Sequence, residues 1–372
     1  MKFSLNTKPL KDAMNLCIIN SNISKFFEKS TVVQLTASGD ALRINTQATS
    51  LISEATLKGS SEGSGESTAI VDCVLLKQLM GTIDSNEVSF DFQDNVLVVE
   101  SGRSKFNVPK LLMDEDEVSL SRPADEVEVS KSFCGELNPD EWKHVQDHQI
   151  YAVSISQIQP DYTYAWMDPE KGVLTGDPRM GTFTYVPGDL LSRTRLVSTT
   201  VVNLLSALDA GSKMYEVNDS EYVVSMHCDA FDFRSEFSVK LEDENNVGTY
   251  DSDMIFDMIF DESQGGASVS KAKISANIKQ ALLFSTPSDP LISLKADESG
   301  LKLVNDNVNC RVSKENGSDD YETSFVVTDL DTVISHMDGD DLEIYPIIKD
   351  DEVFGIRVKS GDMIALLGGV DE

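Results

Sequence analysis

Hydrophobic and polar positions along the chain follow two periods, one typical of short helices and one typical of strands. Six segments read as short amphipathic helices, the first with Leu10, Ala13, Met14 and Cys17 at positions i, i+3, i+4 and i+7. These helices are predicted to begin near Lys8, Cys73, Pro139, Thr199, Ile278 and Asp329. Their spacing, a loose period of about 60 residues, indicates an internal repeat.

Local signals set the ends of several predicted helices. Pro9 suits a first turn, and Asp72 suits an N-cap ahead of a stripe formed by Leu75, Leu76, Leu79 and Met80. The third helix opens on the sequence Asn-Pro-Asp-Glu at 138–141, which combines a cap, a proline and an acid. The fifth is predicted from Ile278 with Leu282 on the same face, and the sixth after Thr328 with a stop at Gly339.

Alternating apolar and polar runs follow the helices and predict strands. The clearest are 88–92, 96–99 and 105–108 after the second helix, and 342–345, 353–358 and 363–367 after the sixth. Each repeat therefore reads as a strand, a helix and three antiparallel strands. The predicted class is α+β, with helices on one face of antiparallel sheets. The alternative is an α+β protein in which similar patterns arise by chance.

Two repeats would make one domain, which predicts three similar domains of 1–120, 121–250 and 251–372. The boundaries fall in acidic segments near 117–125 and 242–269, the second of which contains a Ser-Gln-Gly-Gly run. Between these repeats, the apolar fragment 254–260 is predicted to be an edge strand or a packing segment.

Charge is the unusual feature of the composition. The 372 residues contain 63 Asp and Glu against 31 Lys and Arg, a formal net charge of −32. This balance argues against a protein that grips nucleic acid or an anionic membrane with its outer surface. No apolar run reaches the ~18 residues of a membrane span, and the first residues lack the apolar core of a signal peptide. Five scattered cysteines suit reduced thiols, so we expect a cytoplasmic protein.

No pattern points to catalysis. The chain has no glycine-rich loop ending in Gly-Lys-Ser/Thr and no His-Glu-x-x-His motif. His144 and His148 stand four residues apart on the third helix, but no carboxylate–histidine arrangement completes a metal site. We therefore expect a protein that is not an enzyme and that has no metal and no cofactor.

Two short stretches resemble the β sliding clamps of bacterial replicative DNA polymerases. The segment 98–106, Val-Val-Glu-Ser-Gly-Arg-Ser-Lys-Phe, is similar to the hairpin that ends the first domain in that family. The segment 173–180, Val-Leu-Thr-Gly-Asp-Pro-Arg-Met, is similar to the family's Ala-Thr-Asp-Gly-His-Arg-Leu in the middle domain. The opening Met-Lys-Phe and the length also agree. The pattern covers the whole chain and resembles that of a divergent member, of cellular or viral origin.

This resemblance implies a ring of two head-to-tail subunits around duplex DNA, with the helices inside and a continuous sheet outside. Such a homodimer would tether the replicative polymerase for processive synthesis in DNA replication. A sliding protein needs only a moderately positive lining, which reconciles DNA with a net charge of −32. Basic or polar residues on or beside five of the six helices are the candidate DNA contacts: Lys8, Lys11, Lys25, Lys77, Lys143, His148, Gln149, Arg195, Lys213, Lys273 and Lys279. The sixth helix offers only His336 among acids.

The resemblance also implies a pocket that takes short peptide motifs of the polymerase and the clamp loader. Its walls would come from two segments: Thr175, Gly176, Pro178, Arg179 and Met180, and Ile364, Leu366 and Leu367. The alternative for the first segment is a plain hairpin turn. The chain ends in Gly-Gly-Val-Asp-Glu, whereas the family has an apolar, proline-containing end, so the peptide specificity is expected to differ.

The subunit interface implied by the resemblance joins an edge strand of the first domain to the fifth helix of the third. It places Phe106 and Val108 opposite Leu282 and Leu283. For Phe106 the alternative is packing in its own core. Two other functions stay open at this point, an acidic adaptor or DNA mimic that binds no DNA, and a carboxylate enzyme such as a glycosidase.

Overall fold

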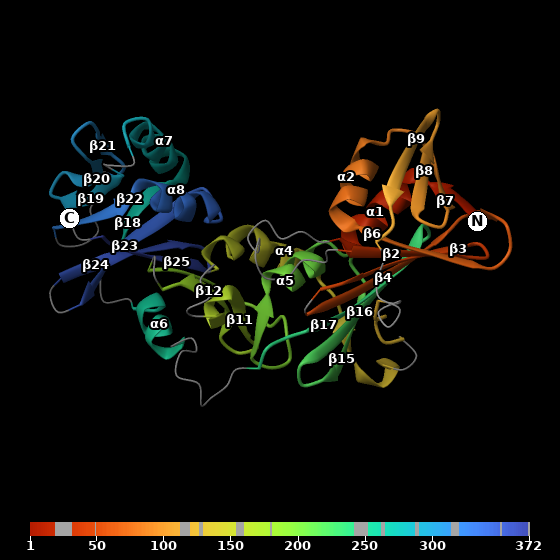
Figure 1. The fold of residues 1–372 in the computed structure, drawn as a ribbon. Coiled ribbons are helices and arrows are strands. Elements are labelled where there is room, and N and C mark those ends of the chain that lie inside the picture. The colour runs from red at the N-terminus through yellow and green to blue at the C-terminus, as the bar shows by residue number, and fades with distance from the viewer. Residues whose placement is uncertain are drawn as a thin grey trace. The chain divides into compact units, whose positions relative to one another are not determined.

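The computed structural model describes residues 1–18, 32–48, 50–111, 120–125, 129–153, 160–178, 181–241, 252–261, 265–286, 290–313, 320–349 and 352–370 (Figure 1). Within these ranges the same order of elements recurs six times along the chain: one strand, one helix and three strands. The structure therefore confirms the predicted α+β class and its strand–helix–three-strand repeats.

The first two repeats occupy the N-terminal part of the chain. The first comprises β1 (Lys2–Asn6), α1 (Thr7–Cys17), β2 (Val32–Ser38), β3 (Ala41–Gln47) and β4 (Leu51–Lys58). After the short β5 (Ser60–Glu62), the second comprises β6 (Glu66–Asp72), α2 (Cys73–Thr82), β7 (Glu87–Phe92), β8 (Val96–Ser101) and β9 (Ser104–Pro109).

The middle two repeats follow the same order. The third comprises β10 (Phe133–Glu136), α4 (Pro139–His148), β11 (Tyr164–Asp168), β12 (Gly172–Asp177) and β13 (Thr182–Val186). The fourth comprises β14 (Arg195–Ser198), α5 (Thr199–Ser206), β15 (Lys213–Asn218), β16 (Glu221–His227) and β17 (Phe231–Ser238).

The last two repeats are preceded by an additional helix, α6 (Ser252–Ile259). The fifth comprises β18 (Ala267–Ser270), α7 (Lys271–Leu282), β19 (Leu291–Asp297), β20 (Gly300–Val304) and β21 (Asn309–Arg311). The sixth comprises β22 (Tyr321–Val326), α8 (Val327–His336), β23 (Asp341–Lys349), β24 (Glu352–Ser360) and β25 (Met363–Gly368).

The contacts of the chain group into two compact units. The first contains 1–143 and 200–241, and the second contains 144–199 and 242–372. The first unit has an eight-stranded antiparallel sheet in the order β10-β15-β16-β17-β4-β3-β2-β6 and a five-stranded sheet in the order β5-β1-β7-β8-β9. Its α1 and α2 pack together, and α1 also contacts β3 and β4 of the larger sheet.

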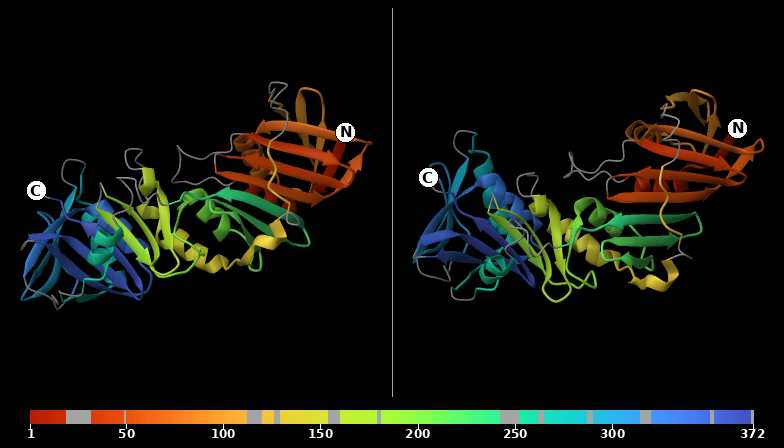
Figure 2. Two further views of the ribbon diagram at one scale, coloured as in Figure 1. Left: turned by 90° about the horizontal axis from the view of Figure 1, so that it is seen from below. Right: turned by 60° about the horizontal axis from the view of Figure 1, so that its bottom comes forward.

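The second compact unit repeats this plan. It has an eight-stranded antiparallel sheet in the order β14-β11-β12-β13-β25-β24-β23-β18 and a four-stranded sheet in the order β21-β20-β19-β22. Figure 2 shows the yellow-green strands of the third repeat beside the blue strands of the sixth, which pair through β13 and β25. Helices α7 and α8 pack together (Figure 1).

Strand pairing in each large sheet joins repeats that are far apart in sequence. Phe233 of β17 pairs with Ala55 of β4, and Thr184 of β13 pairs with Ala365 of β25. Buried and more exposed positions alternate along β17, as the two-residue period of a half-buried strand requires, whereas every residue of β13 is buried. These long-range pairings join the strands of distant repeats into each eight-stranded sheet.

Several helix ends agree with their predicted causes. The Leu75 backbone N–H donates to Asp72 Oδ1 over 2.7 Å, which confirms Asp72 as the N-cap of α2. Ahead of α4, Asn138 Nδ2 donates to Glu141 Oε1 over 2.8 Å. The predicted stripe of α2 was partly wrong, because Cys73, Leu76 and Met80 are buried whereas Leu75 is 45% exposed.

Two predictions about the C-terminal third need correction. Helix α7 begins at Lys271, seven residues before the predicted start at Ile278, because Ile274, Ile278 and Ala281 form its buried stripe. The fragment 254–260 is not an edge strand. It is mostly helical in α6, and its Ile255 and Ile259 share the i, i+4 spacing of a helix face. The alternative prediction of a packing segment is confirmed.

Candidate functional site

The predicted DNA contacts on α1 and α2 divide into exposed and engaged lysines. Lys8 is exposed on α1. Lys11 is half-buried, and its Nζ donates over 2.6 Å to the carbonyl of Ile83, which caps the C-terminus of α2. Lys77 Nζ donates over 2.6 Å to the carbonyl of Ile18, which caps α1. Both lysines therefore hold the helix pair together.

Burial lowers the pKa of Lys77 from its usual value. The negative end of the α1 dipole and the Ile18 carbonyl nevertheless favour a cation at this place. Lys11 and Lys77 add positive charge where α1 and α2 pack together. Their ammonium groups, however, are already hydrogen-bonded to backbone carbonyls.

Histidines gather where α4 and α8 end in the second compact unit. The rings of His144 and His148 are 4.6 Å apart between centroids, and Tyr151 stacks on His336 at 4.2 Å. His148 Nδ1 lies 2.6 Å from the carbonyl oxygen of His336. Burial and the neighbouring His148 lower the pKa of His144, which favours its neutral form. The sixth helix, α8, was predicted to lack lysines. Its end contacts the imidazole of His148 through the His336 carbonyl.

Two predicted DNA contacts are buried side chains with structural partners. Gln149 is fully buried, and its Nε2 donates to the carbonyls of Val173 and Thr184 over 2.9 and 3.1 Å. Arg195 is also buried and donates to the Thr194 carbonyl over 2.7 Å. Their polar groups bond to backbone carbonyls of the protein, so Gln149 and Arg195 are not part of the proposed DNA surface.

The remaining predicted DNA contacts are mostly exposed cations. The structure exposes Lys143 at α4, Lys213 at the start of β15, and Lys273 and Lys279 on α7. Lys25 lies outside the described residues. On α8 the exposed positions are Thr328, Thr332 and Ser335, which are neutral.

The two predicted walls of the peptide pocket lie next to each other. β13 pairs with β12 on one side and with β25 on the other, so Phe183 stands between Gly176 and Leu366. A Cβ at Gly176 would lie 2.2 Å from the Phe183 ring, so only glycine fits there. Pro178 is partly exposed at the end of β12, and Arg179 and Met180 lie outside the described residues.

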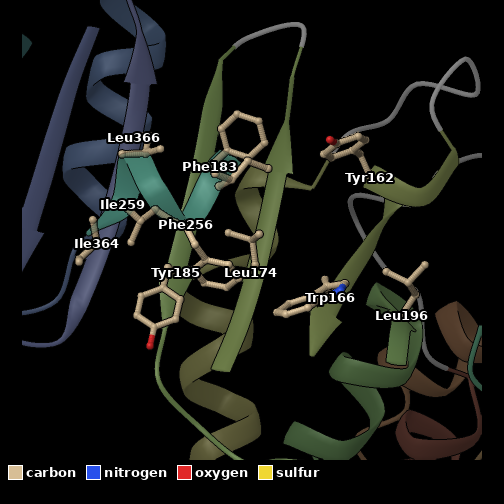
Figure 3. Packing of buried hydrophobic residues seen from close by; sticks show 11 residues of the cluster. Tyr162, Trp166, Leu174, Phe183, Tyr185, Leu196, Phe256, Ile259, Ile364 and Leu366 are labelled. Carbon is tan, nitrogen blue, oxygen red and sulfur yellow. The ribbon is translucent and has the colours of Figure 1, made fainter. Parts of the chain in front are cut away.

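Most of the described wall residues are covered. Thr175 is fully buried and donates to the Gln149 carbonyl over 2.9 Å. Ile364 and Leu366 belong to a cluster in which α6 lies on β13 and β25, with Phe256 and Ile259 directed at the sheet (Figure 3). Leu367 is buried as well. Among the described wall residues, Thr175, Ile364, Leu366 and Leu367 therefore offer no exposed apolar side chain to a peptide, which the sequence did not indicate.

The C-terminal segment is tied to three neighbouring elements. The backbone N–H of Gly368 donates to the Gly181 carbonyl, that of Gly369 to the Phe354 carbonyl, and that of Val370 to the Ser324 carbonyl, over 3.0, 2.6 and 2.8 Å. The double glycine permits this close approach, because a Cβ at Gly369 would lie 2.5 Å from Thr323 Oγ1. The departure from the family's C-terminus thus coincides with tight backbone packing.

The predicted subunit interface residues lie at the ends of two sheets. β9 is the outermost strand of the five-stranded sheet in the described chain, and its Phe106 is partly exposed. Val108 is buried in its own core. In the second compact unit Leu282 is partly buried, whereas Leu283 is 81% exposed and Phe284 is 52% exposed. β21 is the outermost described strand beside them.

An ionic group that sequence reasoning missed fastens β4 to β17. The buried Glu54 accepts hydrogen bonds from Arg122, from Arg234 over 2.8 Å and from Asn45 over 3.1 Å. Burial alone would raise the pKa of Glu54, but these donors outweigh it and lower the pKa to about 2. Asp125 pairs with the same Arg234 over 3.0 Å. Only the pairing of distant strands brings these residues together.

The backbone of the segment 120–125 is hydrogen-bonded to polar side chains of the eight-stranded sheet in the first compact unit. Gln34 Oε1 accepts from the Leu120 backbone N–H over 2.9 Å, and Gln47 Oε1 accepts from Ser121 over 3.2 Å. Glu236 Oε2 accepts from Ala124 over 2.9 Å. The backbone of this segment, which contains the first predicted domain boundary, is thus held by strands of the sheet.

Other kinds of site are not evident in the described chain. Within the described ranges, no three His, Cys, Asp or Glu side chains are grouped in a way that could hold a metal ion. None of the described helices is long and apolar enough to cross a membrane.

The repeated strand–helix–three-strand plan, with paired helices and large sheets joined across repeats, defines the fold of a β sliding clamp. Among solved structures, the β subunit of DNA polymerase III from Thermotoga maritima matches with a TM-score of 0.79 and 12% identity, over 100% of this chain and 99% of that one. The sliding clamp of Bartonella birtlesii bound to griselimycin matches with a TM-score of 0.75 and 13% identity, over 100% of both chains.

The β subunit of Borrelia burgdorferi, in complex with a natural product, matches with a TM-score of 0.72 and 13% identity, over 100% of this chain and 98% of that one. No protein-family model and no curated protein sequence matches the chain. The fold is thus shared over the full length at low identity, which makes this chain a divergent example of the β-clamp fold.

Proposed function

We propose that the protein is a DNA sliding clamp that encircles duplex DNA and tethers a replicative polymerase. The observation that carries this proposal is the full-length match to the β-clamp fold. In this proposal the six repeats form three domains of 1–120, 121–250 and 251–372. The chain would act without catalysis and without a cofactor, on DNA in the cytoplasm of its cell or host.

The proposed DNA surface is the exposed side of the helices. Lys8, Lys143, Lys273 and Lys279 are exposed on or beside α1, α4 and α7, and Lys213 follows α5. Lys11 and Lys77 add charge from their capping positions, and His148 lies in the last turn of α4. The exposed hydroxyls of α8 are neutral. A few exposed cations attract phosphates without gripping them, which is what sliding needs.

The proposed ring is a homodimer closed between β9 of one subunit and the end of α7 of its partner. β9 is an outer strand of its described sheet, and β21, in the same repeat as α7, is an outer strand of the four-stranded sheet; pairing such edges would cover them. Leu283 and Phe284 offer exposed apolar side chains for this contact, and Phe106 offers a partly exposed one. Val108 and Leu282 would act mainly by supporting these neighbours.

Polymerase and clamp loader would bind through short peptides at the junction of β12, β13 and β25. The pairing of these strands and the apolar cluster beneath α6 support this assignment. Because α6 covers Leu366, we propose that a peptide either enters beside Pro178 or displaces part of α6. The peptide motif would differ from that of the family, since Gly368 and Gly369 replace the apolar end.

The topological test uses circular DNA. The dimer would be dissociated by dilution, mixed with nicked plasmid and concentrated so that rings close around the DNA. We expect protein to co-elute with the circle and to be released once a restriction enzyme linearises it. Equally fast loss from circular and linear DNA would contradict encirclement. A mass equal to one chain at micromolar concentration would contradict the dimer.

The acidic adaptor that binds no DNA has no support beyond the net charge of −32. In the same assay, an adaptor of this kind would be retained on neither circular nor linear DNA, even at low salt. The protein would have to be folded in that experiment, whether as a dimer or as a monomer.

A further inference from the structure

A cavity lies in the second compact unit, beside the C-terminal end of α6. Its volume is about 590 Å³, within the range of cavities that hold small ligands or peptide side chains. Ile259 and Ile364 form apolar wall, and Tyr185, Phe260 and Tyr345 supply three aromatic rings. The resemblance to the clamps assigned only Ile364 among these residues.

The aromatic rings are held at fixed angles. Tyr185 and Phe260 meet edge to face, with centroids 5.2 Å apart and an interplanar angle of 78°. Phe260 also stacks on Phe256 at 5.9 Å. Phe260 is 52% exposed, although it stands beside the buried cluster. An exposed ring supported by two buried ones is suited to receive another apolar side chain.

Arg357 closes one side of the cavity and fixes α6. Its Nη1 donates to the carbonyl of Ile259 over 3.1 Å and to that of Asp261, and its guanidinium lies 4.4 Å from the centroid of the Tyr345 ring. The arginine thus satisfies carbonyls at the end of the helix, where the helix dipole is negative. Its position is set by the fold, and it contributes a buried positive charge next to the cavity.

Lys359 provides the cation that remains available. It is partly exposed at the cavity, on the strand β24 that also carries Arg357, and it forms no ion pair with any residue in the described ranges. The Tyr185 hydroxyl likewise has no hydrogen bond to a described residue. Burial and the nearby Asp362 raise the pKa of Tyr185, so its hydroxyl stays protonated and can donate.

We propose that this cavity binds a short acidic segment of a partner protein, with an apolar or aromatic side chain against Tyr185, Phe260 and Tyr345. A carboxylate of the segment would accept hydrogen bonds from Lys359 and the Tyr185 hydroxyl. On a chain of net charge −32, two cations beside an aromatic cavity are a local exception that selects for an anionic partner. The exposed Asp362 disfavours a second carboxylate on the opposite side.

This site requires neither a ring nor DNA. It shares Ile364 with the proposed peptide site but extends from the Tyr185–Ile364 pair toward Tyr345 and Lys359, away from Gly176 and Leu366. Binding here would therefore continue when the subunit interface is disrupted, and its failure would leave the clamp proposal untouched.

The test measures binding of capped tetrapeptides to the full-length protein by calorimetry at constant ionic strength. The probe is acetyl-Gly-Phe-Glu-Glu-amide, compared with versions in which Glu is replaced by Gln or by Lys, or Phe by Ala. We expect the acidic probe to bind about fivefold more tightly than the Gln version, as one charged contact at a partly exposed site predicts. The Ala version should also lose affinity.

Variants then assign the binding to the cavity. Lys359→Glu should weaken the acidic probe about fivefold or more, and Asp362→Asn should strengthen it about twofold. Lys295→Glu on β19 makes the same charge change away from the cavity and should leave affinity within about twofold. Because both lysines are at least partly exposed, thermal unfolding should report intact folds for both variants.

Photo-cross-linking gives an independent readout. With p-benzoylphenylalanine in place of Phe, the adducts should map to β13, to the residues ending α6, or to β23. The proposal is overturned by adducts confined to other elements, by equal affinity for the Glu and Gln probes, by tighter binding of the Lys probe, or by no binding at millimolar peptide.

Discussion

Lys11 and Lys77 each bind the carbonyl that caps the other's helix. Lys11 of α1 donates to Ile83 at the end of α2, and Lys77 of α2 donates to Ile18 at the end of α1, both over 2.6 Å. The two helices belong to consecutive repeats, so this reciprocal bond expresses the repeat at the level of single atoms. Residues that the sequence nominated for DNA thus also hold the helix pair.

Removing either lysine should destabilise the first compact unit. We expect Lys11→Met and Lys77→Met each to lower the free energy of unfolding by about 1 kcal/mol, because a helix-end carbonyl loses its charged donor. Urea denaturation followed by circular dichroism measures this loss. Lys8→Met, at an exposed position of α1, is the control and should change stability by less than about 0.5 kcal/mol. Equal effects of all three variants would contradict the capping role.

Glu54 should make folding sensitive to acid. Its pKa is about 2 in the folded protein and its ordinary value is 4.5, so the unfolded chain binds the extra proton between these values. The stability from Glu54 is therefore complete above about pH 5 and is lost as the pH falls toward 2, by roughly 2–3 kcal/mol in total. The measurement is the free energy of unfolding between pH 3 and pH 7.

Glu54→Gln should flatten this part of the pH profile and destabilise the protein at neutral pH, because Arg122 and Arg234 lose their shared carboxylate. Glu66→Gln, which breaks an exposed pair with Arg43, is the matched control and should cost less than about 1 kcal/mol. A wild-type profile retained in Glu54→Gln would show that another carboxyl causes the acid sensitivity.

Phe256 should be the main anchor of α6 on the sheet. It is buried against Trp166 and Tyr185, with ring centroids 5.6 and 5.9 Å apart. Phe256→Ala should destabilise the second compact unit by about 3–4 kcal/mol, the usual cost of removing a buried ring. Trp166 fluorescence, recorded in a Trp142→Phe background, reports the change. Met254→Ala, at an exposed position of α6, should leave both stability and fluorescence nearly unchanged.

Leu283 should control the proposed dimer. Because its side chain is 81% exposed in the single chain, Leu283→Asp should leave the free energy of unfolding of the isolated subunit unchanged within about 0.5 kcal/mol. It should reduce the mass observed by sedimentation velocity from two chains to one, since a buried carboxylate disfavours the interface. Phe354→Asp, at another exposed aromatic position, is the control that should remain dimeric. Dimerisation of Leu283→Asp would move the interface elsewhere.

Lys273 and Lys279 should contribute to DNA retention without gripping it. Replacing both by Glu should shorten the lifetime of the ring on nicked circles. It should also reduce the slope of log affinity against log salt by about two, nearly one for each lost phosphate contact. The dimer should stay intact, as sedimentation shows. The same changes at Lys295 and Lys302, in the adjacent sheet, should have little effect; an equal effect would indicate general electrostatics instead of a lining.

Much of the fold could be predicted because its signals are local. Three-strand runs and helix stripes recur with the period of their own secondary structure, and Asp72 caps α2 from a distance of three residues. The start of α7 was missed because Lys271 and Lys273 make its first turn polar. The buried stripe of the helix begins only at Ile274. The helix α6 was ambiguous because a short apolar run suits both a strand and a helix.

The candidate site was harder to predict than the fold. Gln149 looked like a polar residue beyond a helix, but its amide satisfies two strand carbonyls from β12 and β13. Leu366 looked like one wall of an open pocket, but α6 covers it. The group around Glu54 joins β4, β17 and the segment 120–125, which are distant in the chain. No local pattern encodes these contacts.

The sequence by itself determined the repeat, the α+β class and the surplus of acids over bases. These properties depend on residue order and composition, which can be read from the sequence without knowing the fold. Only the tertiary structure decided which cations stay exposed, which carbonyls Lys11 and Lys77 bind, and where α6 leaves a cavity beside Lys359. The reason is physical: exposure, hydrogen-bond partners and cavities arise where elements far apart in sequence pack, and the free energy of that packing is not local.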